Sequence, residues 1–349
     1  MIIRARSSAI ARSWTRRVRP QMRRVEHDVH SQLHDHTTEP GLTQLSASGF
    51  VDNDGVRVAW YEVGPTDAAV TAVFIHGYSL SAESFYSQVA DVRANYPSVR
   101  CLLVDVRGHG LSTHVGPSEC TVRGAADDVL AVIAERADTG PLVVMGHSMG
   151  GMIALNLLRR APRQVAQRIE GMLLVSTSMQ RFAAEGMARV LETRTLGAIY
   201  NACLRLPNRL NRARFETAAM VAPAFAALLQ GFPQMDKLQF HVSMLLDTPM
   251  SSYSGFFDDL VEHSEFGAAP RLRDIQGEIV VGNHDIVTPR RQSEVIARHW
   301  PAATFTAIEG AGHMVILEEP REVSKALGRV LDLSLIHISE PTRLRRISY

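Results

Sequence analysis

The chain has 349 residues, of which 46% are hydrophobic, and its 37 Lys and Arg residues balance 36 Asp and Glu. This balance predicts no nucleic-acid binding, and the apolar fraction is typical of a globular protein. No apolar run reaches the roughly 18 residues that span a bilayer, and three scattered cysteines predict a reducing compartment rather than a disulfide framework.

The first 41 residues differ in composition from the rest. Eight arginines and no acid lie between Met1 and Val25, so this segment cannot bury a core and is expected to be disordered. No apolar region of a secretory signal is present. An organelle transit peptide and an over-long reading frame with Met22 as the true start both stay open, and we expect a cytoplasmic protein unless the leader is genuine.

The same segment contains four histidines: His27, His30, His34 and His36. Without a folded shell of supporting residues around them, they do not predict a physiological metal site. No motif in the chain implies a metal or an organic cofactor.

From residue 48 onward, strands alternate with helices. An Asp54-Gly55 pair between two alternating runs predicts a β-hairpin over residues 48–64. Continuous apolar runs predict six further strands, each buried on both faces: residues 71–77, 99–108, 141–148, 170–178, 277–285 and 303–313. Apolar residues spaced by three and four predict five helices: residues 81–95, 121–137, 149–160, 289–300 and 318–331. The alternation predicts an α/β fold, with a mostly parallel central sheet flanked by helices.

Residues 179–270 break this rhythm, because they contain no convincing strand and read as helices. A connection usually takes a few residues, so we expect an inserted helical cap over the carboxyl edge of the sheet, where ligands bind in open α/β sheets. The cap would divide the core into residues 42–178 and 271–332. Its larger apolar residues could line an acyl pocket or simply pack together: Phe182, Phe215, Phe225, Phe232, Met235, Phe240 and Met244.

Residues 333–349, "LSLIHISEPTRLRRISY", resemble the translation of a sequencing adaptor. They are therefore predicted to be an artefact without functional meaning. An ordinary amphipathic terminus is the alternative.

The most informative stretch is Gly146-His147-Ser148-Met149-Gly150, which lies between a predicted buried strand and a predicted helix. Gly-x-Ser-x-Gly in that context is typical of a sharp turn that exposes the serine hydroxyl. The helix that begins at Met149 also presents unpaired N–H groups and the positive end of its dipole. We therefore expect Ser148 to be a nucleophile.

A serine hydroxyl needs a base, and the base needs an acid to orient it. His313 in "GAGHMV" follows the last predicted strand, and Asp285 in "VVGNHDIVTP" follows the strand before it. The chain order Ser148, Asp285, His313 is the order that this architecture requires. Asp105, which precedes "RGHG", competes as the acid.

Other polar residues near the strand ends are predicted to be structural, because none matches the position of the base. These are His76, His109, His147 and Arg107, while His284 is expected to point away from the site.

In order along the chain, the motifs "FIHGYS", "DVRGHGLS", "GHSMGG", "GNHDIVTP" and "GAGHMV" resemble those of the α/β-hydrolase superfamily of serine hydrolases. The similarity covers about residues 49–332. The resemblance implies an oxyanion hole made of the backbone N–H groups of Tyr78 and Met149. It also implies that Asp105 fixes a loop and is not the acid of the triad. It also disfavours epoxide hydrolases and haloalkane dehalogenases, because those relatives carry an aspartate where Ser148 stands.

The predicted function is hydrolysis of a carboxylic ester, thioester or lactone of a small to medium apolar compound, with Ser148, His313 and Asp285 as the triad. Carbon–carbon bond hydrolases and cofactor-free perhydrolases of the superfamily use the same triad and stay open. A small-molecule receptor on the same fold is the alternative of another class. The sequence does not predict an oligomeric state.

Overall fold

The computed structural model describes residues 41–181, 240–241, 243–245 and 247–339, and all of them belong to one compact unit, Pro40–Tyr349. The predicted leader, most of the predicted cap and the last ten residues lie outside the described part. The centre of the described part is an eight-stranded sheet with strand order β1-β2-β4-β3-β5-β6-β7-β8. The strands are β1 (Ala47–Asn53), β2 (Val56–Val63), β3 (Val70–Ile75), β4 (Val99–Val104), β5 (Leu142–His147), β6 (Ile169–Val175), β7 (Gln276–Gly282) and β8 (Ala303–Ile308).

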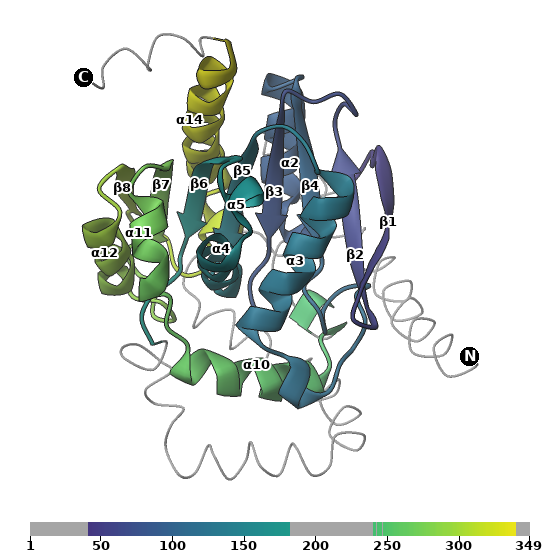
Figure 1. Ribbon diagram of the computed structural model, residues 1–349. Coiled ribbons are helices and arrows are strands. Elements are labelled where there is room, and N and C mark those ends of the chain that lie inside the picture. Colours follow the sequence, from purple (N-terminus) through teal and green to yellow (C-terminus); the bar gives the residue numbers. More distant parts are fainter. Residues whose placement is uncertain (1–40, 182–239, 242, 246, 340–349) are drawn as a thin grey trace, which may run out of the picture. The chain divides into compact units, whose positions relative to one another are not determined.

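The hairpin β1-β2 pairs antiparallel, and β2 pairs antiparallel with β4, whereas all other pairs are parallel. The expected mostly parallel sheet is therefore confirmed. In Figure 1 the parallel strands point toward the side of the sheet on which α10 lies. The loops that follow β3, β5, β7 and β8 all leave from this carboxyl edge, which is why residues distant in sequence can meet there.

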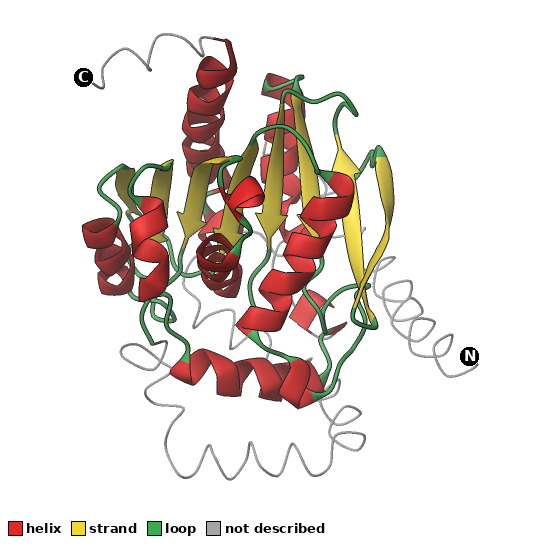
Figure 2. Cartoon of the chain, viewed as in Figure 1, coloured by secondary structure: helices red, strands yellow, loops and turns green. Residues whose placement is uncertain are grey.

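Helices cover both faces of the sheet (Figure 2). The longer helices are α2 (Tyr86–Asn95), α3 (Val122–Arg136), α4 (Met149–Arg160), α10 (Met250–Glu262), α12 (Arg290–His299) and α14 (Pro320–Ser339). The shorter ones are η1 (Ala82–Phe85), η2 (Pro117–Glu119), α5 (Arg163–Ala166), η4 (Phe266–Ala268), α11 (Ala269–Leu272) and α13 (Val315–Glu318). The ends of two predicted helices are confirmed, since α4 stops two residues before Pro162 and α12 stops two residues before Pro301.

The core consists of two apolar layers, one on each face of the sheet, and β3 shows how the sequence builds both. Val73 and Ile75 point into the layer that contains α3, α4 and α12, whereas Ala72 and Phe74 point into the layer that contains α2 and α14. Each fully buried Val, Ile or Phe side chain contributes about 1.5–3 kcal/mol. A continuous apolar run is thus stable only where both of its faces are covered.

Two details differ from the sequence-based expectation. The strand β8 was expected to be buried on both faces, but its residues are mostly only half-buried, because it is the edge strand and has one neighbour. The last helix was expected over residues 318–331, but α14 begins at Pro320 and continues to Ser339. Proline suits the first helical position, where its missing N–H has no intrahelical partner in any case.

Because α14 runs without a break past residue 332, residues Leu333 to Ser339 are helical. The hydroxyl of Ser334 donates a hydrogen bond of 3.0 Å to Glu170. The interpretation of residues 333–349 as an artefact stays a prediction. None of the helices in the described ranges is long and apolar enough to cross a membrane.

Candidate active site

Ser148 lies at the turn from β5 into α4, with φ +53° and ψ −121°. A positive φ is uncommon for a residue with a side chain and costs on the order of 1–3 kcal/mol unless the surroundings impose it. The side chain is 8% exposed. The turn therefore holds a strained serine that is almost completely buried.

Two glycines allow this turn because neighbouring backbone passes too close for any side chain. A Cβ atom at Gly150 would lie 2.0 Å from the carbonyl oxygen of Ile75, and one at Gly146 would lie 2.4 Å from the carbonyl oxygen of Gly150. The first turn of α4 is thus pressed against the ends of β3 and β5. This close approach explains why the serine stands between glycines.

His313 follows β8 and contacts both other predicted triad residues. Its Nε2 lies 2.9 Å from Ser148 Oγ, and its Nδ1 lies 2.9 Å from Asp285 Oδ2. A carboxylate can only accept, so Nδ1 carries the proton and Nε2 is left to accept the serine O–H. Such a contact chain increases the nucleophilicity of a hydroxyl.

Asp285 is held rigidly just beyond β7. Its Oδ1 accepts the backbone N–H groups of Val287 and Thr288, each at 2.9 Å, and its Oδ2 accepts the Thr288 hydroxyl at 2.9 Å. Burial acts to raise the pKa of this carboxyl, but the His313 ring and these hydrogen bonds outweigh it and hold the pKa below its ordinary value. Asp285 therefore stays ionised beside the imidazole.

Thr288 was assigned no role in the sequence analysis. Its hydroxyl lies 2.9 Å from Asp285 Oδ2 and 3.3 Å from His313 Nδ1. The sequence indicates this contact only through the position of Thr288, three residues after Asp285, from which a hydroxyl can hydrogen-bond to the carboxylate.

The two predicted oxyanion donors belong to the residue after Ser148 and to the loop after β3. Met149 is the first residue of α4, where a backbone N–H has no intrahelical partner. Tyr78 follows Gly77 in the loop after β3, and a Cβ atom at Gly77 would lie 3.1 Å from Ser148 Cβ. The loop after β3 therefore passes directly beside the turn that carries Ser148.

The residues predicted to be structural hold the loops around the site. Asp105 accepts hydrogen bonds of 2.8 Å from the N–H groups of Ala82 and Leu111 and from the Tyr61 hydroxyl. The guanidinium of Arg107 forms two hydrogen bonds of 2.7 Å with the carboxylate of Asp128 in α3.

The four histidines that were not predicted to be the base, His76, His109, His147 and His284, fall into three kinds of environment. His76 and His109 each accept a backbone N–H through Nε2, from Val106 and Ser79 respectively. His284 is exposed. His147 differs, because its Nε2 lies 3.0 Å from the backbone oxygen of His313.

Three described residues near the start of α10 belong to the predicted cap. Phe240 stacks edge-on against Tyr86 with ring centroids 5.6 Å apart, and Met244 is buried in the apolar layer of α2 and α14. His241 is buried, and burial, with a contribution from His313, lowers its pKa to about 4. Five predicted cap residues lie outside the described part: Phe182, Phe215, Phe225, Phe232 and Met235.

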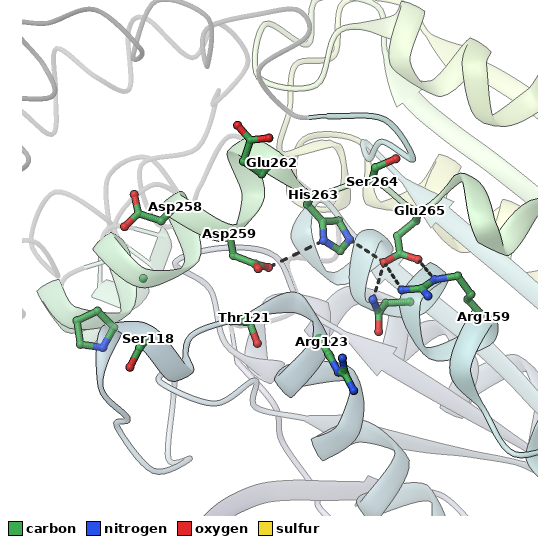
Figure 3. Close-up of a pocket in the computed structure, with 13 residues that line it drawn as sticks. Ser118, Thr121, Arg123, Arg159, Asp258, Asp259, Glu262, His263, Ser264 and Glu265 are labelled. Atoms are coloured by element: carbon green, nitrogen blue, oxygen red, sulfur yellow. Dashed lines mark hydrogen bonds and ion pairs between the residues drawn. The ribbon is translucent and has the colours of Figure 1, made fainter.

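A hollow of about 660 Å³ lies elsewhere, between the C-terminal end of α10 and the helices α3 and α4. Figure 3 shows that it is lined mainly by charged and polar side chains, among them Asp259, His263 and Arg159. Neither Ser148, Asp285 nor His313 lines it. Among the residues that the structure describes, no group of three His, Cys, Asp or Glu side chains is placed to hold a metal ion.

Comparisons with known proteins agree with this architecture. The chain is 25% identical over 274 residues to the 30 kDa magnesium-chelatase subunit of Rhodobacter capsulatus, which covers 74% of this chain and 86% of that protein. It is 25% identical over 254 residues to a pimeloyl-(acyl-carrier protein) methyl ester esterase of Neisseria meningitidis, covering 72% of this chain and 89% of that protein. A thermophilic esterase from Thermogutta terrifontis superposes with a TM-score of 0.63 at 20% identity, covering 84% of this chain and 99% of that chain.

The last of these likenesses shows the fold alone, and the first two carry different activities in their names. A model of the alpha/beta hydrolase family matches residues 72–326, which is well over half of the chain. The sheet, the strand-turn-helix at Ser148 and this match lead to one conclusion: the protein belongs to the alpha/beta hydrolase family.

Proposed function

We propose that this hydrolase cleaves a carboxylic ester, thioester or lactone of a small to medium apolar compound through an acyl-enzyme on Ser148. The observation that carries the proposal is the contact chain from Ser148 Oγ through the His313 ring to Asp285, with 2.9 Å at each step. The similarity to a methyl ester esterase of Neisseria meningitidis supports the ester class.

In the first half of the reaction, Ser148 Oγ attacks the carbonyl carbon while its proton passes to His313 Nε2. The carbonyl oxygen becomes an oxyanion. As the bond to the leaving group breaks, His313 gives that proton to the departing alcohol, thiol or tethered lactone oxygen. Asp285 stays ionised and stabilises the imidazolium that exists between these two transfers.

In the second half, His313 takes a proton from a water molecule, whose oxygen attacks the acyl carbon. Breakdown of the second tetrahedral intermediate returns the proton to Ser148 Oγ and releases the carboxylic acid. The backbone N–H groups of Tyr78 and Met149 would hold the oxyanion in both halves. Losing one such donor typically raises the barrier by about 2.7–4 kcal/mol.

The test combines active-site labelling with turnover. Wild-type protein should react with a fluorophosphonate at Ser148 and hydrolyse p-nitrophenyl acetate. The variant Ser148→Ala should lose both, with turnover reduced by roughly 10⁴–10⁶-fold. Ser118→Ala, which removes an exposed hydroxyl in η2, is the matched control and should behave as wild type.

Retained turnover in pure Ser148→Ala protein would contradict the assignment. A panel of short esters, acyl thioesters, lactones, vinylogous diketones and peracid formation then ranks the carboxylic ester against carbon–carbon cleavage and perhydrolysis. Saturable binding with barely one turnover would instead favour a receptor.

A further inference from the structure

The carboxylate of Glu318 reaches back from the end of α13 to the loop that carries His313. Its Oε2 accepts the backbone N–H of Gly312 at 2.5 Å, and its Oε1 accepts the backbone N–H of Met314 at 3.0 Å. One carboxylate thus holds the residue before His313 and the residue after it.

A second residue, His147, holds the backbone carbonyl of His313. The carbonyl oxygen of His313 lies 3.0 Å from His147 Nε2. A carbonyl only accepts, so His147 Nε2 donates, and the ring is neutral because burial lowers its pKa to about 3. His147 immediately precedes Ser148, so this bond joins the base loop to the nucleophile turn.

An ordinary helix cap does not account for Glu318. A cap would satisfy the first N–H groups of α13, and the bond to Met314 fits that description. The bond to Gly312 does not, because that residue lies outside the helix, on the far side of His313. The Glu318 side chain therefore bridges the two neighbours of His313 and does not only cap a helix.

We propose that Glu318 is a positioning residue, whose two-oxygen grip on the flanking N–H groups keeps the His313 imidazole within reach of both Ser148 and Asp285. The inference rests on the proposed function. A displacement of about 1 Å in a catalytic group can cost roughly 100-fold in rate. If the loop lost one of these hydrogen bonds, His313 would therefore be a poorer base, while substrate binding would be unaffected.

Glu318→Gln is the sharpest variant, because it keeps the shape of the side chain. The amide offers one oxygen and one NH₂ group, so one of the two backbone N–H groups would face a donor. We expect kcat for p-nitrophenyl acetate to fall about 10- to 100-fold with KM within about twofold. Fluorophosphonate labelling of Ser148 should slow by a similar factor.

The matched control is Glu319→Gln, which changes the neighbouring glutamate, an exposed side chain. Its kcat should stay within about twofold of wild type. Glu318→Asp keeps the charge but shortens the reach, and should lower kcat in the same direction, which provides a second measurement if Glu318→Gln does not fold. Thermal unfolding of each variant shows whether it is folded.

A proton NMR signal separates positioning from general stability. The Nδ1 proton of His313, which lies between the ring and Asp285, should give a downfield resonance that shifts or broadens in Glu318→Gln and not in Glu319→Gln. Wild-type kcat and an unchanged resonance in folded Glu318→Gln would overturn the inference. So would an equal loss of kcat in Glu319→Gln.

The two proposals fail in different ways. A wild-type chain that neither labels at Ser148 nor hydrolyses any ester would overturn the proposed function. The His313 resonance in the two variants would still show whether Glu318 positions the ring.

Discussion

The hydroxyl of Tyr78 donates a hydrogen bond of 2.6 Å to the backbone carbonyl of Tyr253, which lies 175 positions later in the chain. The two rings meet edge to face with centroids 5.2 Å apart. The Tyr253 hydroxyl in turn donates to the carbonyl of Leu245 at 2.9 Å. The loop that carries a proposed oxyanion donor is therefore tied through α10 to the segment around Leu245.

Removing this tie should affect catalysis more than folding. In Tyr78→Phe the backbone N–H stays, but the loop loses a hydrogen bond of about 0.5–1.5 kcal/mol. We expect kcat for p-nitrophenyl acetate to fall by up to about tenfold with little change in KM. Steady-state kinetics measures both quantities.

Tyr96→Phe is the control for that prediction. The Tyr96 hydroxyl lies against Gly328 of α14, outside the proposed site, so its kcat should match wild type. Equal effects in the two variants would show that the tie to α10 is not specific to the oxyanion loop.

Glu265, near the end of the predicted cap segment, is hydrogen-bonded to α4, the helix that begins directly after Ser148. Its carboxylate accepts hydrogen bonds from Asn156 at 2.5 Å and from Arg159 at 2.8 Å, both in α4 (Figure 3), and its backbone N–H donates to the carbonyl of Met179 at 2.8 Å. The side chain is 1% exposed, whereas that of Arg159 is 39% exposed. Met179 and Glu265 are thus hydrogen-bonded to each other near the two ends of the predicted cap segment.

Glu265→Gln should destabilise the protein by about 1.5–3 kcal/mol, because it replaces charge-assisted hydrogen bonds at a buried carboxylate. Urea unfolding measures this change. Glu262→Gln is the matched control, since Glu262 is 71% exposed and pairs with Arg181, which is 65% exposed. The free energy of unfolding of this variant should differ from wild type by less than about 0.5 kcal/mol. A similar loss in both variants would argue against an anchoring role for Glu265.

His76 and His109 should make the protein sensitive to acid. Each accepts a backbone N–H through Nε2, and each places Nδ1 near a backbone carbonyl, at 2.8 Å for His76 and 3.1 Å for His109. Both rings are therefore neutral, with the proton on Nδ1. Burial lowers the pKa of His76 to about 4, and burial together with the neighbouring His76 lowers that of His109 to about 3.

The unfolded chain takes up these protons as pH falls below about 6.5, whereas the folded chain does not until about pH 4. The stabilising contribution is therefore complete above pH 6.5 and is lost as pH falls toward 4. Each such histidine contributes a slope of about 1.4 kcal/mol per pH unit in that window.

Urea unfolding at a series of pH values measures the slope. His109→Gln should reduce it by about 1.4 kcal/mol per pH unit, whereas His299→Gln, which changes an exposed histidine, should leave it unchanged. A free energy of unfolding that stays constant from pH 7 to 5 would contradict the prediction.

The sequence predicted the strands better than it predicted the packing around them. Every predicted strand is present, because a continuous apolar run such as residues 71–77 is stable in a sheet whose two faces are both covered by helices. The half-buried state of β8 could not be read from its sequence, since an edge is defined by the absence of a neighbour. The helix α10 lies within the segment that was predicted to be helical, but its bounds could not be read from its polar start "MSSYSG". Its buried residues Phe256 and Leu260 pack in the same apolar layer as α3.

Within the site, the sequence by itself determined the turn at Ser148. Glycine on both sides and a strand before it are local requirements, set by backbone sterics that act over a few residues. The tertiary structure decided which distant groups meet that serine: His313 lies 165 positions away and Asp285 lies 28 positions from His313. It also decided the hydrogen bonds that Thr288 and Glu318 make, which depend on how the loops fold back. Hydrogen bonds act over about 3 Å, so only the folded chain brings these atoms within their range.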